Sequence, residues 1–217
     1  MNKLYKESYF SSPIWYMDAP EFLKDLNKAS DPHIKQAQNL LKPTVEERKK
    51  LYKKNIGDFA LVAHSGSLLS DMKFRPFTEY VGNMSVRLLE EMGYNLQGFN
   101  TAFTELWVQE FSKKGGGHHS LHTHWNGHIS GFYFLKASER TSGPIFQDPR
   151  YGALMNGLPR KDKKNVNEES NYEVFFQPAP GKLMFFPSYL PHMFSVDSGI
   201  DPFRFIHFNI RAIPAGV

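Results

Sequence analysis

The chain has 217 residues, a net charge of +4 and no cysteine. This length suits one domain with a sizeable core, and the lack of cysteine excludes disulfides, thiolate zinc sites and cysteine nucleophiles. Aromatic residues make up 15% of the chain, which favours a β-rich core over a helical bundle. The lysine-rich runs at 46–54 and 160–164 have no nucleic-acid recognition motif beside them, so nucleic-acid binding is not expected.

The first residues, MNKLYKESYFSS, contain no apolar signal-peptide core. No apolar run approaches the roughly 20 residues needed to cross a bilayer. Together with the lack of cysteine, these features predict a cytoplasmic protein that has no membrane partner.

The first hundred residues favour helices. We expect one helix to begin near Pro20, where proline fits the first turn, and a second over residues 31–42 that ends at Pro43. Apolar residues at helical spacing predict an amphipathic third helix over 76–93. The sequence therefore predicts a helical support region over 1–100.

The pattern changes after Gly93 to short segments rich in aromatic and β-branched residues, separated by Gly, Pro, Asn and Asp. Such a series predicts a mainly β fold, a sandwich or barrel such as a jelly roll, over 101–217. We expect a long polar loop over 151–171 and a single domain over 1–217. The predicted strands are 103–111, 129–136, 143–147, 172–177, 181–187, 192–196 and 203–211.

Five of the nine histidines crowd into one stretch, HHSLHTHWNGHIS. His122 and His124 are two residues apart, so on an extended chain both side chains point to one face, which suits two ligands of one metal ion. Imidazole favours Fe, Zn, Cu and Ni over Mg and Ca. His118 and His119 follow three glycines and are expected to be exposed, while His128 follows a turn and has no assigned role.

A third ligand has to come from a separate strand, and His192 opens one after a proline-bounded corner. Arg204 begins the last predicted strand, 12 positions later (204 − 192 = 12). A guanidinium directed into an apolar sandwich is costly unless it is paired. Arg204 therefore either keeps its head group in water or binds an anion, for which its planar fork suits a carboxylate.

Four ordered sequence blocks connect these residues. They are H-x-H-(5)-S-G-x-Y-x-L at 122–135, F-x-D-P-R at 146–150, P-x-x-G-x-L-x-x-F-P-S-x-L-x-H at 178–192 and R-x-x-x-F-N at 204–209. In this order they resemble the 2-oxoglutarate/Fe(II)-dependent oxygenase superfamily, and most of all a bacterial and phage subgroup with an H-x-H…H metal motif. The resemblance covers 103–212 and implies a double-stranded β-helix, the cupin-like form of the jelly roll.

The resemblance also implies roles for the candidate residues. His122 and His192 would bind iron, and Arg204 would pair with the distal carboxylate of 2-oxoglutarate. The superfamily motif H-x-D/E…H has a carboxylate where this chain has His124. Three ligand sets remain open: three histidines, which we favour; two histidines with His124 outside the coordination shell; and two histidines with a carboxylate from elsewhere.

Asp148 is the nearest candidate for such a carboxylate. Its place in the F-x-D-P-R block is explained more simply by a turn or by an ion pair with Arg150. If His124 replaces the carboxylate, the net charge of the metal site rises by one, which alters iron affinity and redox poise.

Several further residues are predicted to line the same pocket. Gln109 and Tyr133 are candidates for hydrogen bonds to 2-oxoglutarate. Asn209 is a weaker candidate, because on a regular strand it lies on the face opposite Arg204, and only one of these two faces can meet the metal. Trp125 and Asn126 are expected at the substrate entrance.

The resemblance implies an Fe(II)-, 2-oxoglutarate- and O2-dependent dioxygenase that oxidises a substrate, a small molecule or a protein side chain, and releases succinate and CO2. Two alternatives remain. One is a three-histidine cupin-like dioxygenase that does not use 2-oxoglutarate, in which Arg204 binds the substrate's own carboxylate. The other is a metal-stabilised binding module without catalysis.

Overall fold

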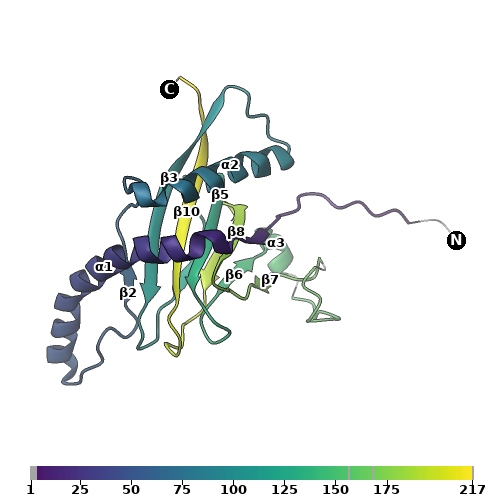
Figure 1. The fold of residues 1–217 in the computed structure, drawn as a ribbon. Helices are drawn as coiled ribbons and strands as arrows, with labels where there is room; N and C mark the ends of the chain where they lie inside the picture. The colour runs from purple at the N-terminus through teal and green to yellow at the C-terminus, as the bar shows by residue number, and fades with distance from the viewer. Residues whose placement is uncertain (1–3, 156, 168, 217) are drawn as a thin grey trace.

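The computed structural model describes residues 4–155, 157–167 and 169–216. Its strands form two antiparallel sheets, one of six strands and one of four. Two long helices lie across the outer face of the larger sheet (Figure 1). The fold is the predicted one, mainly β with N-terminal helices and a double-stranded β-helix core. Within the described residues, no helix has both the length and the apolar character that a membrane crossing requires.

The larger sheet has the strand order β1-β8-β5-β10-β3-β2. Its central strands carry aromatic and β-branched residues on both faces, because helices cover one face and the smaller sheet covers the other. The two edge strands, β1 and β2, come from the N-terminal region that was predicted to be helical. The bounds are β1 Trp15–Asp18, β2 Val62–His64, β3 Phe99–Phe111, β5 Ile129–Lys136, β8 Lys182–Pro187 and β10 Arg204–Pro214.

The smaller sheet has the order β4-β9-β6-β7. Its strands are β4 His119–His122, β6 Pro144–Gln147, β7 Glu173–Phe175 and β9 His192–Phe194, and a single turn of helix, α3 (Tyr151–Leu154), begins the loop between β6 and β7. All seven predicted strands are present, while β1, β2 and β4 were not predicted. These three strands are short, with three or four residues each.

The first helix differs from the prediction. A short 3-10 turn, Pro20–Phe22, leads into one continuous helix, α1 (Leu23–Tyr52), which contains both Pro32 and Pro43. The predicted end at Pro43 is therefore wrong. Each proline removes one backbone hydrogen bond. On either side of Pro32, the buried residues Ala29 and Ile34 pack in the apolar core and stabilise the helix, whereas the buried residues of α1 end at Ala37, before Pro43. Figure 1 shows α1 bending along its length, as prolines within a helix produce.

The second long helix, α2 (Arg75–Glu91), matches the predicted segment 76–93 and follows the short turn Met72–Phe74. Its buried residues join α1 and the outward-facing side chains of β5, β8 and β10 in one apolar cluster. A second cluster, made almost entirely of phenylalanine, fills the space between the two sheets. The larger sheet thus has a helix-covered face and an interior face, and this distinction positions the site.

Candidate metal centre

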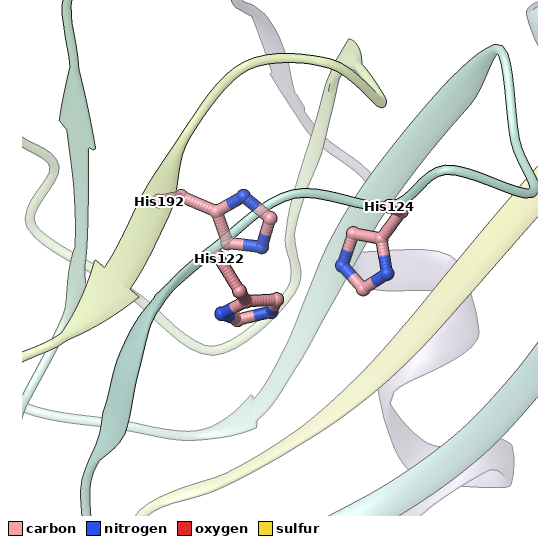
Figure 2. A group of neighbouring side chains, drawn as sticks. All are labelled: His122, His124 and His192. Atoms are coloured by element: carbon pink, nitrogen blue, oxygen red, sulfur yellow. The ribbon is translucent and has the colours of Figure 1, made fainter.

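Three histidines converge between the two sheets. His122 at the end of β4 and His192 at the start of β9 are register partners, and their rings lie 4.4 Å apart. His124 follows β4, and its backbone N–H donates to the carbonyl of Ser188 at 2.9 Å, which holds it beside the corner before β9. One potential ligand atom from each ring lies within 4.8 Å of the others. Figure 2 shows the three rings facing a common centre, with a nitrogen of His124 directed toward His122 and His192.

Backbone carbonyls orient two of these rings. His122 Nδ1 lies 2.7 Å from the carbonyl oxygen of Ser120, and His192 Nδ1 lies 3.0 Å from that of Leu190. A carbonyl only accepts, so each Nδ1 carries the ring proton and each Nε2 keeps its lone pair for a metal. Nε2 of His192 is buried and has no hydrogen-bond partner among the described residues. These are features of metal-binding histidines.

His124 has a different support. Its Nδ1 lies 3.0 Å from the side-chain amide of Asn209, while its Nε2 is buried without a partner in the described part of the chain. The amide atom that faces Nδ1 is Nδ2, which also donates to Glu105, so in this arrangement Nδ1 accepts and the ring proton lies on Nε2. For Nε2 to bind a metal, the proton must move to Nδ1 and the amide of Asn209 must turn its oxygen toward it. Asn209, weakly favoured from the sequence, therefore lies next to a candidate ligand and controls its orientation.

The structure adds two residues that the sequence analysis missed. His207 is 1% exposed, its ring lies 4.6 Å from that of His124, and neither of its nitrogens has a partner among the described residues. Glu105 lies 3.7 Å from His207 Nε2 and accepts a hydrogen bond from Asn209 Nδ2 at 3.0 Å. Glu105, His124 and His207 form a second group of potential metal ligands. The alternation of side chains along a strand could have indicated both residues. Positions 105, 107 and 109 share one face of β3, and positions 207 and 209 share one face of β10.

Burial determines the protonation of these rings. Burial, with a smaller contribution from the nearby His122, lowers the pKa of His192 to about 3 and that of His124 to about 4. Burial also places the pKa of His207 well below its ordinary value. The three imidazoles are therefore neutral at neutral pH, which is the form that binds metal ions.

Arg204 lies on the other face of the sheet. Its Nη1 is 2.6 Å from Asp31 on α1, its Nη2 is 2.7 Å from Glu110 on β3, and its side chain is 5% exposed. Glu110 also accepts a hydrogen bond from Gln38 of α1 at 3.1 Å. The expectation that Arg204 faces the histidines is wrong, because the alternation along β10 directs His207 and Asn209 inward and Arg204 toward α1.

Tyr133 also lies on the helix-covered face of the sheet. Its ring packs in the helix-covered cluster, 5.2 Å from the ring of Phe77 on α2, and its hydroxyl donates to the carbonyl of Ala19 at 2.8 Å. Burial raises its pKa. The neighbouring Phe132 points inward instead, with its ring 5.7 Å from that of His192. Tyr133 is therefore not beside the histidines, and the predicted hydrogen bond to a co-substrate there is wrong.

Gln109 does lie in the interior. It is fully buried, and its amide contacts His119 Nε2 at 2.7 and 3.0 Å. His119, expected to be exposed, is half-buried, and burial lowers its pKa to about 4. His118 is exposed and contacts only the carbonyl of Gly116 among the described hydrogen bonds. His128 accepts a hydrogen bond from the backbone of Ala212, on the far end of β10.

The remaining candidates lie farther out. Trp125 is 91% exposed, and Asn126 donates to Glu105 Oε1 at 3.3 Å, so both lie at the outer rim of the histidine cluster. Asp148 forms the predicted ion pair with Arg150, with Oδ2 2.7 Å from Nη2. It belongs to neither group of potential metal ligands. Glu105 is thus the carboxylate near the site, and Asp148 is not.

Part of the chain is similar to a known protein family. Residues 105–204 match the family model described as "Putative 2OG-Fe(II) oxygenase". Over this segment, slightly less than half of the chain, the protein is similar to 2OG-Fe(II) oxygenases. The match agrees with the resemblance inferred from the motifs. The family uses Fe(II), 2-oxoglutarate and O2, which are the cofactors expected from the sequence. No curated protein sequence matches the chain.

Solved structures of 2OG-Fe(II) oxygenases resemble the fold. A prolyl-4-hydroxylase from Pseudomonas putida aligns over 93% of this chain and 94% of its own, with a TM-score of 0.54 and 10% identity. A viral collagen prolyl hydroxylase from Paramecium Bursaria Chlorella virus-1 aligns over 98% of each chain, with a TM-score of 0.45 and 12% identity. A 2OG-Fe(II) oxygenase family oxidoreductase from Burkholderia pseudomallei aligns over 66% of this chain and 54% of its own, with a TM-score of 0.40 and 13% identity. The first likeness shows a shared fold.

The donor set fits the family's metal but not the expected anchor for its co-substrate. Three imidazole ligands suit Fe(II), and three protein ligands leave coordination positions open. The arginine expected to hold 2-oxoglutarate is already paired with two carboxylates on the opposite face of the sheet. His122, His124 and His192 would hold the metal, whereas Arg204 does not reach the site.

Proposed function

We propose that the protein is a non-haem Fe(II) oxygenase that couples the oxidative decarboxylation of 2-oxoglutarate to hydroxylation of a C–H bond. Substrate, O2 and 2-oxoglutarate would give hydroxylated substrate, succinate and CO2. The observation that carries the proposal is the convergence of His122, His124 and His192 inside a fold whose family uses these reactants. We place the reaction in the cytoplasm, as expected for a chain without cysteine.

The metal would supply oxygen activation, and the protein chain supplies position and surroundings. Carbonyls of Ser120 and Leu190 fix two imidazole rings, and the amide of Asn209 fixes the third. Phe132 and Phe186, with ring centroids 5.7 and 4.7 Å from that of His192, keep water from the inner side of the centre. This apolar wall protects a reactive oxidant from side reactions.

The proposed substrate is a small molecule or a protein side chain. A groove of about 360 Å³ lies between the N-terminal segment around residues 8–14 and the loop after β6. The groove includes Phe146, whose ring lies 5.9 Å from that of His192. Residues of the 151–171 loop line it, which supports the expected role of this loop on the substrate side.

The experiment combines visible spectroscopy with a measurement of how oxygen consumption depends on 2-oxoglutarate. Addition of Fe(II) and 2-oxoglutarate without oxygen should produce a weak visible charge-transfer band, and oxygen consumption should then require 2-oxoglutarate. The variant His192→Ala should show neither, while His118→Ala should behave as the wild type. Absence of the band in a protein that binds one Fe(II) per chain would refute the use of 2-oxoglutarate.

One observation favours the alternative of a three-histidine dioxygenase that does not use 2-oxoglutarate, namely the engagement of Arg204 by Asp31 and Glu110. Oxygen consumption with Fe(II) alone and a suitable substrate, unchanged by 2-oxoglutarate, would support it. Retention of zinc without any oxygen consumption would instead support a metal-stabilised binding module.

A further inference from the structure

His207 on β10 is a buried side chain to which the proposed function gives no role. It is 1% exposed, and neither of its ring nitrogens has a hydrogen-bond partner among the described residues. A buried imidazole in this condition costs stability, because both nitrogens have given up their contacts with water. His207 is outside the group formed by His122, His124 and His192, so that centre does not offset the cost. A cation beside His207 would give one of its nitrogens a partner.

Two neighbouring residues supply further metal donors beside His207. Glu105 Oε2 lies 3.7 Å from His207 Nε2, and the ring of His124 lies 4.6 Å from that of His207. One potential ligand atom from each of the three residues lies within 4.8 Å of the others. The ring separation of 4.6 Å falls within the 4.4–5.1 Å found among the rings of the three-histidine centre. The second group therefore converges as closely as the first.

Hydrogen bonds hold the carboxylate of Glu105 in place. Its Oε1 accepts from the side-chain amide of Asn126 at 3.3 Å, and its Oε2 accepts from Asn209 Nδ2 at 3.0 Å. The indole N–H of Trp107 donates to the same Oε2 at 3.4 Å. Supports of this kind orient the ligands of metal sites. The side chain of Glu105 is 34% exposed, so an ion can reach it from the outer rim, and two imidazoles with one carboxylate suit Zn(II), Fe(II) and similar transition metals.

His124 belongs to both groups of potential ligands, and only one group can use it at a time. Asn209 Nδ2 lies 3.0 Å from His124 Nδ1 and 3.0 Å from Glu105 Oε2, so Nδ1 is the nitrogen on the side of Glu105. A cation in place of this N–H donor would contact both atoms. The three-histidine centre instead uses Nε2, which is buried without a partner among the described residues. A neutral imidazole has a lone pair on only one of its two nitrogens, so His124 binds an ion on one side or on the other.

We propose that Glu105, His124 and His207 form a second binding site for a divalent transition-metal ion. The site shares His124 with the three-histidine centre, so the chain holds one ion, in one position or the other. An ion in the second site leaves the three-histidine centre with His122 and His192 alone. The inference goes beyond the proposed function, because it involves neither 2-oxoglutarate nor oxygen.

The test is a titration of the metal-free protein with Zn(II), followed by calorimetry. The wild type should bind one ion per chain. His192→Ala disables the three-histidine centre and should still bind one ion, on the order of 100-fold or more weakly than the wild type, because the ion then occupies the partly exposed second site. Two ions per wild-type chain would contradict the sharing of His124, and no binding by His192→Ala would contradict the second site.

Further substitutions in His192→Ala identify which residues hold its ion. Addition of His207→Phe or Glu105→Gln should weaken the remaining Zn(II) binding by on the order of 100-fold, because each removes a ligand. Addition of His122→Ala is the matched control and should leave this binding unchanged, because His122 belongs to the three-histidine centre alone. Dependence on His122 rather than on His207 would show a remnant of the three-histidine centre and would overturn the proposal.

Phenylalanine suits position 207 because the surrounding side chains are aromatic, with the ring of His207 4.6 Å from that of Trp107 and 5.4 Å from that of Phe132. A purely structural role for His207 predicts unchanged Zn(II) binding in His192→Ala after His207→Phe, which would contradict the second site. Glu105→Gln, at a partly exposed position, decides the question if His207→Phe does not fold. In the otherwise wild-type chain, His207→Phe should keep tight binding at the three-histidine centre, and loss of this binding would overturn the separation of the two sites.

Discussion

Polar residues on the two faces of β10 differ in whether they have hydrogen-bond or ion-pair partners. On the interior face, His207 and Asn209 lie beside the candidate metal ligands, and both nitrogens of His207 have no partner among the described residues. On the helix-covered face, Arg204 is held by two carboxylates and makes three hydrogen bonds or ion pairs at 2.6–2.8 Å. A buried polar group without a partner is costly. The comparison therefore separates a face whose polar groups are paired from a face whose buried polar groups lack hydrogen-bond partners among the described residues.

The largest expected effect concerns the interior face. His192→Ala removes one of the three candidate imidazole ligands. Loss of a residue that only orients a ligand already lowers metal affinity by roughly 10–100-fold, so loss of a ligand should lower it by on the order of 100-fold or more. Metal content after dialysis measures this loss. His118→Ala is the control, because His118 is exposed. If His192→Ala kept its metal at wild-type affinity, the three-histidine site would be refuted.

The next effect concerns the helix-covered face. Arg204→Met leaves Glu110 buried without its main partner, so the free energy of unfolding should fall by about 3–5 kcal/mol. The double variant Glu110→Gln, Arg204→Met removes both charges and should recover most of this loss. Urea denaturation measures both. Equal destabilisation by the single and double variants would show that packing, rather than the ion pair, matters at this position.

The stability of the metal-free protein should depend on pH because of the buried histidines on the interior face. The pKa values of His192 and His124 are lowered to about 3 and about 4 by burial, whereas unfolded histidine titrates near 6.5. Between these values the unfolded chain binds more protons, so the metal-free protein should lose stability as the pH falls from about 6.5 toward 4. The slope is at most about 1.4 kcal/mol per pH unit for each histidine. His192→Gln should reduce the slope measured by urea denaturation in the presence of a chelator, and an unchanged slope would contradict the prediction.

The smallest effect concerns Tyr133. Tyr133→Phe removes the hydrogen bond to the carbonyl of Ala19 and should lower the free energy of unfolding by about 1 kcal/mol. Because Tyr133 lies on the helix-covered face, metal and 2-oxo acid affinities should stay at wild-type values. A selective loss of 2-oxoglutarate affinity in this variant would place the hydroxyl in the site after all.

The sequence by itself determined the main elements and the metal candidates. Alternation and turn residues predicted seven strands, and the spacing of His122, His124 and His192 predicted a cluster that the structure brings together. These signals are local or follow a regular period, so they can be read along the chain. Continuation of α1 through Pro43 could not be read in this way, because proline within a helix normally marks its end.

Only the tertiary structure decided which side of each strand meets the metal. Tyr133 and Arg204 occur at the expected places in the motifs, yet both lie on the helix-covered face. Parity groups Asn209 with His207 and separates both from Arg204, but it does not say which group points inward. That choice depends on where α1 packs, since Asp31 and Glu110 together form the charged pocket that holds Arg204. The sequence thus supplied the candidate ligands, and the packing of a distant helix decided what surrounds them.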